Sequence, residues 1–361
     1  MRFLLIWSLC ACVLSLDTVD AAPPASPQSF AGTGEPPNSG SPHPDATMPK
    51  LRSQAKLGTP FGVEVVEDRF WITTIDDHCV YRGLLGGDSI ERVAGNGMVG
   101  YSGDGGPALK ATFNWPHEVR CDDAGNLFIA DTRNHVIRRI DGVTGIVITV
   151  AGDGTAGFAG EDSSGNEVRF NQPHSVALDG EGGLLVADTA NHRIRRIDLS
   201  TMAVTTVAGN GKKELPPDGS PAQGCSLFGP RSLAVDKSSI WIAMREGNSV
   251  WRIDRRAGTI HRVAGTGKKG YSGDRGDPLQ ATFSGPKGLA IDRRGRLLVA
   301  DTENNAVRRI DLSKQTIETV MGGNAAPHSC ELKRPHGINV IDGTVVLVAD
   351  SENHRLMTDA R

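Results

Sequence analysis

Six residues able to do chemistry occupy one repeated position, directly after a proline. In six places a proline, one further residue and an alternating apolar run follow one another, a pattern typical of a β-strand. The prolines are Pro60, Pro116, Pro173, Pro230, Pro286 and Pro335. The residues after them, here called the mouth ring, are Phe61, His117, His174, Arg231, Lys287 and His336. Apolar core packing does not explain three histidines and two cations at equivalent positions, so this set is the candidate site.

The mouth ring predicts either of two chemistries. Three neutral imidazoles and a water would make a zinc-type site, with His117, His174 and His336 as ligands. Alternatively, Arg231, Lys287 and protonated histidines would attract a carboxylate or phosphate group. Anion binding would then strengthen as the pH falls toward the histidine pKa values. A third interpretation is a polar rim in which histidine is merely common at this repeat position.

The elements that must position these residues are short strands. After Pro173, apolar and β-branched runs at 175–179, 184–188, 193–198 and 204–207 alternate with Gly, Asp and Asn turns. The same programme follows each of the six prolines, which recur at intervals of 49 to 57 residues. This repetition predicts an all-β, six-bladed propeller with four antiparallel strands per blade. The blades are expected to start near residues 59, 115, 172, 229, 285 and 334.

The N-terminal segment is predicted to close the ring. The sixth repeat reaches Arg361 after three strands and lacks a fourth. The sequence SFAGTG at 29–34 matches RVAGTG at 262–267, where the fourth repeat ends. We therefore expect residues 22–58 to supply the missing strand, paired with residues 355–357, and a loop leading into the first blade.

Strand direction places the mouth ring at one end of the central channel. We call the face on which the first strand of each blade begins face A. The links from each fourth strand to the next blade lie on face A as well, and four of them are long. Two links carry the sequence GYSGD, which makes Tyr101, Asp104, Tyr271 and Asp274 candidate ligand-binding residues. Aspartate oxygens suit calcium, although packed loop decoration explains the same residues.

A second motif recurs in the turn after the second strand of four repeats. It reads DTRNHVIR at 131–138, DTANHRIR at 188–195, DTENNAVR at 301–308 and DSENHRL at 350–356. This motif resembles the NHL repeat. The resemblance covers nearly the whole chain after residue 22 and implies a propeller, whereas the tryptophan-aspartate signature of WD40 blades is absent. Because the Asn-His pairs recur from blade to blade, we expect them to be scaffold, with Asn in a left-handed turn. NHL propellers have many functions, so the fold alone does not give one.

The histidine positions are also similar to those of the peptidyl-hydroxyglycine amidating lyases, which are six-bladed NHL-like propellers. That resemblance implies zinc ligation by His117, His174 and His336. It also implies histidines on blades two, four and six, whereas here they are on blades two, three and six, and Arg231 occupies blade four. The chain shows no clear match for the lyase's catalytic tyrosine.

Composition limits the partners and the location. The 361-residue chain has a formal net charge of -3, which argues against nucleic-acid binding. Residues 1–21 read as a signal peptide, and no later run is apolar enough to span a membrane, so a secreted or periplasmic monomer is expected. Four cysteines remain after the signal, with pairing undetermined: Cys79, Cys121, Cys225 and Cys330.

Two functions remain open at this point. The first is a scaffold that binds a small anionic ligand, a peptide or a protein at the channel mouth and the links. The alternative is a metal-dependent lyase or lactonase-like enzyme that uses the mouth-ring histidines. No Gly-x-Ser-x-Gly nucleophile motif occurs in a strand-to-helix context, and the sequence does not decide whether the protein is an enzyme.

Overall fold

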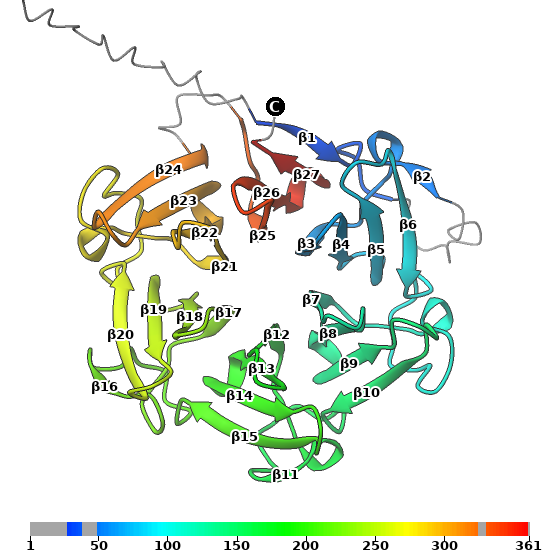
Figure 1. The fold of residues 1–361 in the computed structure, drawn as a ribbon, viewed down its shortest axis with the longest axis horizontal. Helices are drawn as coiled ribbons and strands as arrows, with labels where there is room; N and C mark the ends of the chain where they lie inside the picture. The colour runs from blue at the N-terminus through cyan, green and yellow to red at the C-terminus, as the bar shows by residue number, and fades with distance from the viewer. Residues whose placement is uncertain (1–26, 38–48, 324–329, 360–361) are drawn as a thin grey trace, which may run out of the picture.

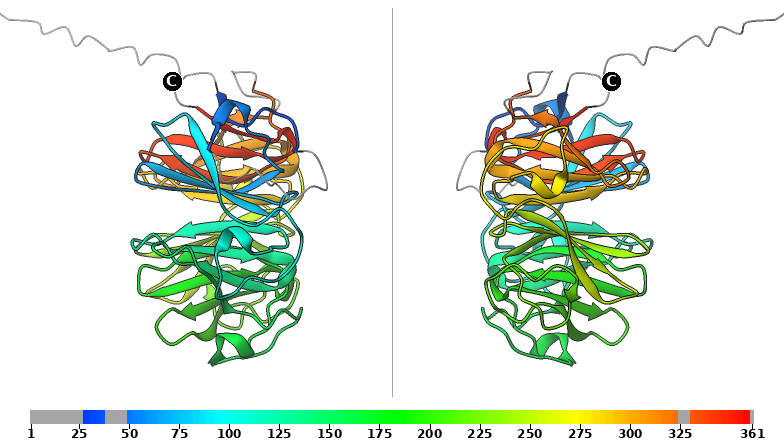
Figure 2. Two further views of the ribbon diagram at one scale, coloured as in Figure 1. Left: turned by 90° about the vertical axis from the view of Figure 1, so that its right-hand side faces the viewer. Right: turned by 90° about the vertical axis from the view of Figure 1, so that its left-hand side faces the viewer.

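The chain forms six four-stranded antiparallel blades around a central axis (Figure 1). The computed structural model describes residues 27–37, 49–323 and 330–359. Figure 2 shows the ring from its edge, with the strands running between the two faces. The predicted six-bladed propeller is confirmed. The predicted signal peptide lies outside the described residues.

In the described chain each blade has its first strand innermost, and short extra strands add to blades one, three and four. Blade one is β3 (Pro60–Val66), β4 (Arg69–Thr74), β5 (Cys79–Leu84) and β6 (Ser89–Ala94), with β2 (Lys50–Leu51) outside. Blade two is β7 (Pro116–Cys121), β8 (Leu127–Asp131), β9 (Val136–Ile140) and β10 (Val147–Ala151). Blade three is β12 (Pro173–Leu178), β13 (Gly183–Asp188), β14 (Arg193–Asp198) and β15 (Ala203–Ala208), with β11 (Ser163–Ser164) outside.

The remaining blades repeat the arrangement. Blade four is β17 (Pro230–Val235), β18 (Ser239–Met244), β19 (Ser249–Asp254) and β20 (Thr259–Ala264), with β16 (Ser220–Pro221) outside. Blade five is β21 (Pro286–Ile291), β22 (Leu297–Asp301), β23 (Ala306–Asp311) and β24 (Thr316–Gly322). Blade six is β25 (Pro335–Ile341), β26 (Val345–Asp350), β27 (Arg355–Thr358) and β1 (Gln28–Ala31). Helical structure in the described residues is limited to three-residue 3-10 turns at Arg52–Gln54, Ala108–Lys110, Thr132–Asn134, Gly165–Glu167, Thr189–Asn191, Pro278–Gln280, Thr302–Asn304 and Ser351–Asn353.

The N-terminal strand closes the ring as predicted. Strand β1 pairs antiparallel with β27, from Gln28 opposite Thr358 to Ala31 opposite Leu356. The same segment contacts blade one, because Phe30 packs edge-on against Phe70 at 5.1 Å. One short segment therefore joins the last blade to the first.

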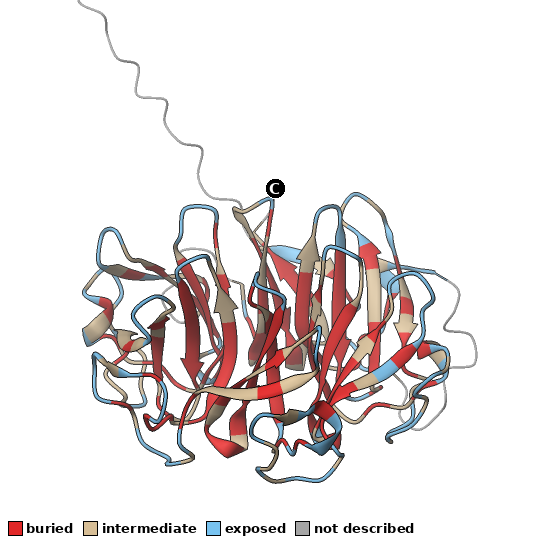
Figure 3. Ribbon diagram, turned by 60° about the horizontal axis from the view of Figure 1, so that its bottom comes forward, coloured by how far each residue is buried: buried red, intermediate tan, exposed pale blue. Residues whose placement is uncertain are grey.

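The core consists of apolar layers between neighbouring blades, with exposed turns at both faces (Figure 3). A large apolar residue stands three positions before every repeat proline, and all six are buried. They are Leu57, Phe113, Phe170, Leu227, Phe283 and Leu332. These six side chains are here called the wedges. Since a single blade cannot bury both of its faces, the wedges are buried only when the whole ring is closed, and stability therefore depends on closure.

A repeated hydrogen bond connects the turn of each blade to the start of the next. The last residue of the turn between the second and third strands of each blade is histidine or asparagine in the left-handed conformation, with φ between 42° and 58°. Its ring Nδ1 or amide Oδ1 accepts the backbone N–H of the residue before the next proline, at 2.8 to 3.3 Å. The acceptors, here called the latch residues, are His78, His135, His192, Asn248, Asn305 and His354.

The scaffold role expected for the Asn-His pairs is thus consistent with their contacts, but one detail differs. In blade two the left-handed residue is His135, not Asn134, which lies in the 3-10 turn. Asn134 Nδ2 instead donates to the Gly100 carbonyl at 2.7 Å and to Asp131 at 2.8 Å. The asparagine therefore holds the link, and the histidine holds the next blade.

A bulge after each proline orients the mouth ring. In all six blades the register between the first and second strands shifts just beyond the proline. A bulge adds one residue to one strand and re-aims the neighbouring side chain. The bulge therefore lets the side chain after the proline face the channel even though the side chain of an adjacent residue also faces it.

The remaining sequence expectations concern helices and cysteines. Within the described ranges, no helix is long and apolar enough to cross a membrane. Cys79, Cys121, Cys225 and Cys330 are all free thiols, and the first three are buried.

Candidate functional site

The mouth ring is brought together at one end of the channel. Its six side chains are nearly buried, with exposed fractions between 5% and 8%. Phe61 stacks on His336 with ring centroids 3.8 Å apart and meets His117 edge-on at 4.7 Å. His117 in turn meets His174 edge-on at 4.7 Å. Four adjacent blades thus supply a continuous aromatic arc, and blades four and five supply the two cations.

Each cation contacts one imidazole from another blade. An Arg231 Nη2 lies 2.8 Å from His117 Nε2, and Lys287 Nζ lies 3.2 Å from His336 Nε2. Guanidinium and ammonium groups only donate, so both Nε2 atoms act as acceptors and we assign both protons to Nδ1. In His336 this Nδ1 faces the Arg334 carbonyl at 2.9 Å and the Ser351 hydroxyl at 3.0 Å.

The histidines do not carry the positive charge of the site. Burial lowers the pKa of His117, His174 and His336 well below the usual value, and Arg231 or Lys287 lowers each further. Protonated histidines, one of the alternatives that the sequence left open, are therefore disfavoured near neutral pH, because burial and the nearby cations oppose a further positive charge. The charge of the ring rests on Arg231 and Lys287 alone.

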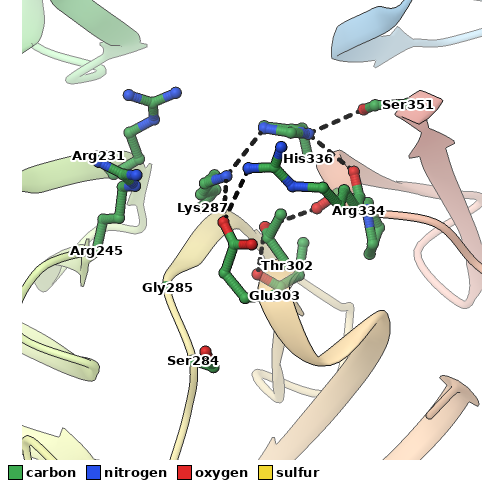
Figure 4. Close-up of polar contacts among 12 residues, drawn as sticks. Arg231, Arg245, Ser284, Gly285, Lys287, Thr302, Glu303, Arg334, His336 and Ser351 are labelled. Carbon is green, nitrogen blue, oxygen red and sulfur yellow. Dashed lines mark hydrogen bonds and ion pairs between the residues drawn. The ribbon is translucent and has the colours of Figure 1, made fainter. Parts of the chain in front are cut away.

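Lys287 is tied to a carboxylate from the turn of its own blade (Figure 4). Glu303 accepts from Lys287 Nζ at 3.0 Å and from Arg334 at 2.9 Å. Burial, and then the Arg231 charge, lower the pKa of Lys287 to about 7 against the opposing effect of Glu303. Protonation of Lys287 therefore depends on the negative charge beside it.

Arg231 has no such carboxylate. Within the described residues its hydrogen-bond partner is His117, its Nε is buried without a partner, and it forms no ion pair. Two fully buried arginines behave differently: Arg138 and Arg308 each contact two aspartates, at 2.6 to 3.5 Å. Burial, and then the neighbouring Arg245, lower the pKa of Arg231, and the carboxylates of Glu246 and Glu118, which do not contact it, offset this only in part.

The predicted zinc site does not fit this geometry. Zinc needs several ligand nitrogens directed at one point about 2.0–2.1 Å away. The Nε2 atoms of His117 and His336 are instead engaged by cations, which also repel a divalent ion. In the part of the chain that the structure describes, no group of three or more His, Cys, Asp or Glu side chains could hold a metal. The geometric basis for the alternative metal-dependent enzyme is therefore missing.

The predicted link residues lie away from the mouth ring. The hydroxyl groups of Tyr101 and Tyr271 contact Thr149 and Thr319 of the outermost strands β10 and β24 (Figure 1). The carboxylates pair with buried arginines: Asp104 with Arg138 at 2.6 Å and Asp274 with Arg308 at 2.8 Å. These contacts give the links a packing role. Ligand binding by the four residues stays a prediction.

Sequence reasoning missed the charged residues around and below the ring. Glu303 and Arg245 come from turns, and Arg245 lies beside Arg231 (Figure 4). Arg245 also pairs with Glu246 at 2.6 Å. Glu64, Glu118 and Arg120 lie deeper in the channel. One signal was available, because Arg245 occupies the turn position that holds a hydroxyl residue in four other blades. Those residues are Thr132, Thr189, Thr302 and Ser351, and each donates to the carbonyl of the next blade's proline.

Comparisons with known proteins agree with the repeat pattern. The NHL repeat model matches residues 170–197 and 283–310. NHL repeat-containing protein 2 of Gallus gallus is 31% identical over 67% of this chain and 38% of that protein. The chain thus spans well under half the length of that relative. A probable peptidyl-alpha-hydroxyglycine alpha-amidating lyase of Caenorhabditis elegans is 28% identical over 37% of this chain and 37% of that protein.

A solved structure extends the likeness to most of the chain. An auxiliary nutrient binding protein of Bacteroides thetaiotaomicron superposes with a TM-score of 0.63 over 92% of this chain and 75% of that chain, at 12% identity. At this identity the likeness shows the fold alone. The repeats of the present chain, its six blades and its NHL repeat-containing relatives show that it belongs to the family of NHL-repeat β-propellers.

Proposed function

We propose that this propeller is a binding protein that captures an anionic group, a carboxylate or phosphate of a small ligand or peptide, at the face-A channel mouth. The observation that carries the proposal is Arg231, a buried cation with no carboxylate partner among the described residues. An unpaired buried charge costs several kcal/mol, roughly, and this cost is relieved when a ligand supplies the opposite charge. Binding of an anion would therefore also remove the energetic cost of burying the unpaired Arg231 charge.

The surroundings of Arg231 suit an anion. The planar guanidinium can hold two oxygens at once, and Lys287 adds a second charge from the next blade. The residue before the proline is glycine in these two blades, Gly229 and Gly285. The other four blades carry larger side chains there: Thr59, Trp115, Gln172 and Arg334. In both blades an acidic side chain takes the space of the missing side chain, Glu246 beside Gly229 and Glu303 beside Gly285, so an anionic ligand must compete with these carboxylates.

The pH dependence differs from the one that the sequence suggests. Because the histidine pKa values are lowered, protonation of imidazole contributes little near neutral pH. Lys287, with a pKa of about 7, becomes the titrating group. Anion affinity should then fall as the pH rises above about 7, while Arg231 holds a residual affinity.

Export is part of the proposal and depends on residues 1–21. Their apolar run after Arg2 is typical of a signal peptide. An exported binding propeller would meet small anions and peptides from outside the cell. The name of the Bacteroides neighbour, an auxiliary nutrient binding protein, is compatible with this role.

Isothermal titration calorimetry with phosphate, acetate and citrate tests the proposal. We expect saturable binding of at least one anion and its loss in Arg231→Gln. Arg309→Gln is the matched control, because Arg309 pairs with Glu318 on an exposed strand of blade five. Equal binding by Arg231→Gln and the parent protein would refute the assignment, as would no binding of any anion at pH 6.

A further inference from the structure

The other end of the channel, on the face opposite to face A and here called face B, holds a second cavity whose chemistry differs from that of the mouth ring. Its volume is about 280 Å3. It is lined by the fourth residue after every repeat proline, a set here called the lower ring. The lower ring is Glu64, Arg120, Ala177, Ala234, Ala290 and Asn339. The same repeat rule that builds the mouth ring therefore builds a second ring below it.

The two rings are separated. The space between the mouth ring and the lower ring, which Glu118 and Ser232 line, has a volume of only about 10 Å3. That is room for about one water molecule, whereas the lower cavity holds many. A ligand in the lower cavity would thus enter from face B and would not contact Arg231.

Polar groups occupy one arc of the lower ring, on blades six, one and two. Glu64 accepts from Asn339 Nδ2 at 3.0 Å and from the Cys121 backbone at 3.3 Å, and it lies 3.5 Å from Arg120. Arg120 also contacts Glu118 and donates to the Val119 carbonyl at 2.8 Å. One arginine thus serves two nearly buried carboxyl groups, and this triad has a net charge of −1 when both of them are ionised.

Apolar groups occupy the other arc, on blades three, four and five. Alanine stands here in place of the long polar side chains of the first arc, at Ala177, Ala234 and Ala290. The cavity exists because these small methyl groups leave space. Leu178, Val235 and Ile291 continue the apolar wall. A hydrocarbon chain would bury its apolar surface against this wall and so be removed from water.

We propose that the lower ring binds a small organic cation, an ammonium group carried on a short apolar chain. The ammonium would neutralise the excess carboxylate of the Glu64, Glu118 and Arg120 triad, and the chain would lie on the alanine arc. An anion is disfavoured because the donors of Arg120 already face two carboxylates and a carbonyl. Burial also raises the pKa of Glu64 to about 6, which agrees with a carboxylate that lacks full compensation.

The test is calorimetric titration with butylammonium chloride at pH 7.5, compared with 1-butanol and sodium butyrate. Butylammonium is expected to bind, and the alcohol and the butyrate to bind at least about tenfold more weakly, because they lack the charge that the triad complements. Equal binding of 1-butanol, or no detectable binding of butylammonium, would overturn the proposal.

Three variants locate the site. Glu64→Gln removes the charge at constant shape and should weaken butylammonium about tenfold, and Ala234→Leu should block the chain while leaving the charges in place. Arg231→Gln changes the other mouth and removes a positive charge near Glu118, so it should not weaken butylammonium binding, and failure of the anion proposal and failure of this one are distinguishable. Thermal melts verify that each variant is folded. A folded Glu64→Gln and a folded Ala234→Leu that both bind normally would refute the site.

Discussion

Glu303 is a built-in competitor for an anionic ligand, and its removal gives the sharpest test of the mouth ring. Its carboxylate lies 3.0 Å from Lys287 and 2.9 Å from Arg334, as a bound carboxylate would. An anionic ligand that binds Lys287 must displace the Glu303 carboxylate from it. Glu303→Gln keeps the shape and removes the charge, so the ligand no longer competes with a fixed anion.

The magnitude follows from the exposure of the pair. The Glu303 side chain is 31% exposed, which places its contact with Lys287 near the upper end of the range for surface ion pairs, about 1 kcal/mol. Removing a competitor of that strength should tighten anion binding about fivefold. This gain requires Lys287 to be charged.

The pH gives the sign of the effect. Glu303 supports the protonated form of Lys287, whose pKa is about 7. Without it, burial and Arg231 lower this pKa further. At pH 6 we therefore expect about fivefold tighter binding in Glu303→Gln, and at pH 8 no gain or a loss.

Calorimetry with the best anion of the panel, at both pH values, measures this difference. Glu318→Gln, which removes an exposed carboxylate from the outer strand of the same blade, is the control. Weaker binding at pH 6 in Glu303→Gln, or the same gain at both pH values, would refute the competition argument.

Three further predictions concern the scaffold. His192→Ala should destabilise the protein by about 2 kcal/mol in urea unfolding, because the N–H of Gly229 loses its buried acceptor, whereas His192→Asn should restore most of the loss, as asparagine is the native latch in blades four and five. Acid should weaken the latches: burial depresses the folded pKa of His78, His135 and His192, so stability present above the unfolded value of about 6.5 should be lost as the pH falls, which urea midpoints at pH 7.5 and 5 would reveal by moving downward. Leu57→Ala should cost about 2–5 kcal/mol, since the side chain is a wedge at ring closure, and an unchanged melting temperature would contradict that role.

The sequence was sufficient for features that repeat. The period of the prolines, the four strand runs and the match of 29–34 to 262–267 identify the propeller and its closure, because each blade must solve the same packing problem. The same argument places the mouth ring, since equivalent positions in a closed ring converge on one axis.

The charge state of the site could not be read from the repeats. It depends on pairs between blades, such as Arg231 with His117, and on Glu303 from a turn. Histidines at a repeated position suggest protonation or metal, yet burial and two neighbouring cations keep them neutral. The protonation state of these histidines therefore depends on side chains from other blades, which the repeat pattern does not reveal.

The acidic links illustrate a signal that was present in the sequence. Asp104 precedes Arg138 by 34 residues, and Asp274 precedes Arg308 by the same interval. In the third blade Glu161 lies near Arg195 at this spacing too. An acid and a buried arginine at constant separation indicate a structural pair, so these carboxylates are weak candidates for calcium.

The pairing of β1 with β27 has a mechanical consequence. Because Gln28 lies opposite Thr358, the two ends of the described chain leave the blade at the same end of the strand pair. Tension between them would load the backbone hydrogen bonds one after another, as in a zipper, rather than all together in shear. The propeller should therefore resist heat through its closed ring yet open at low force when pulled by its ends.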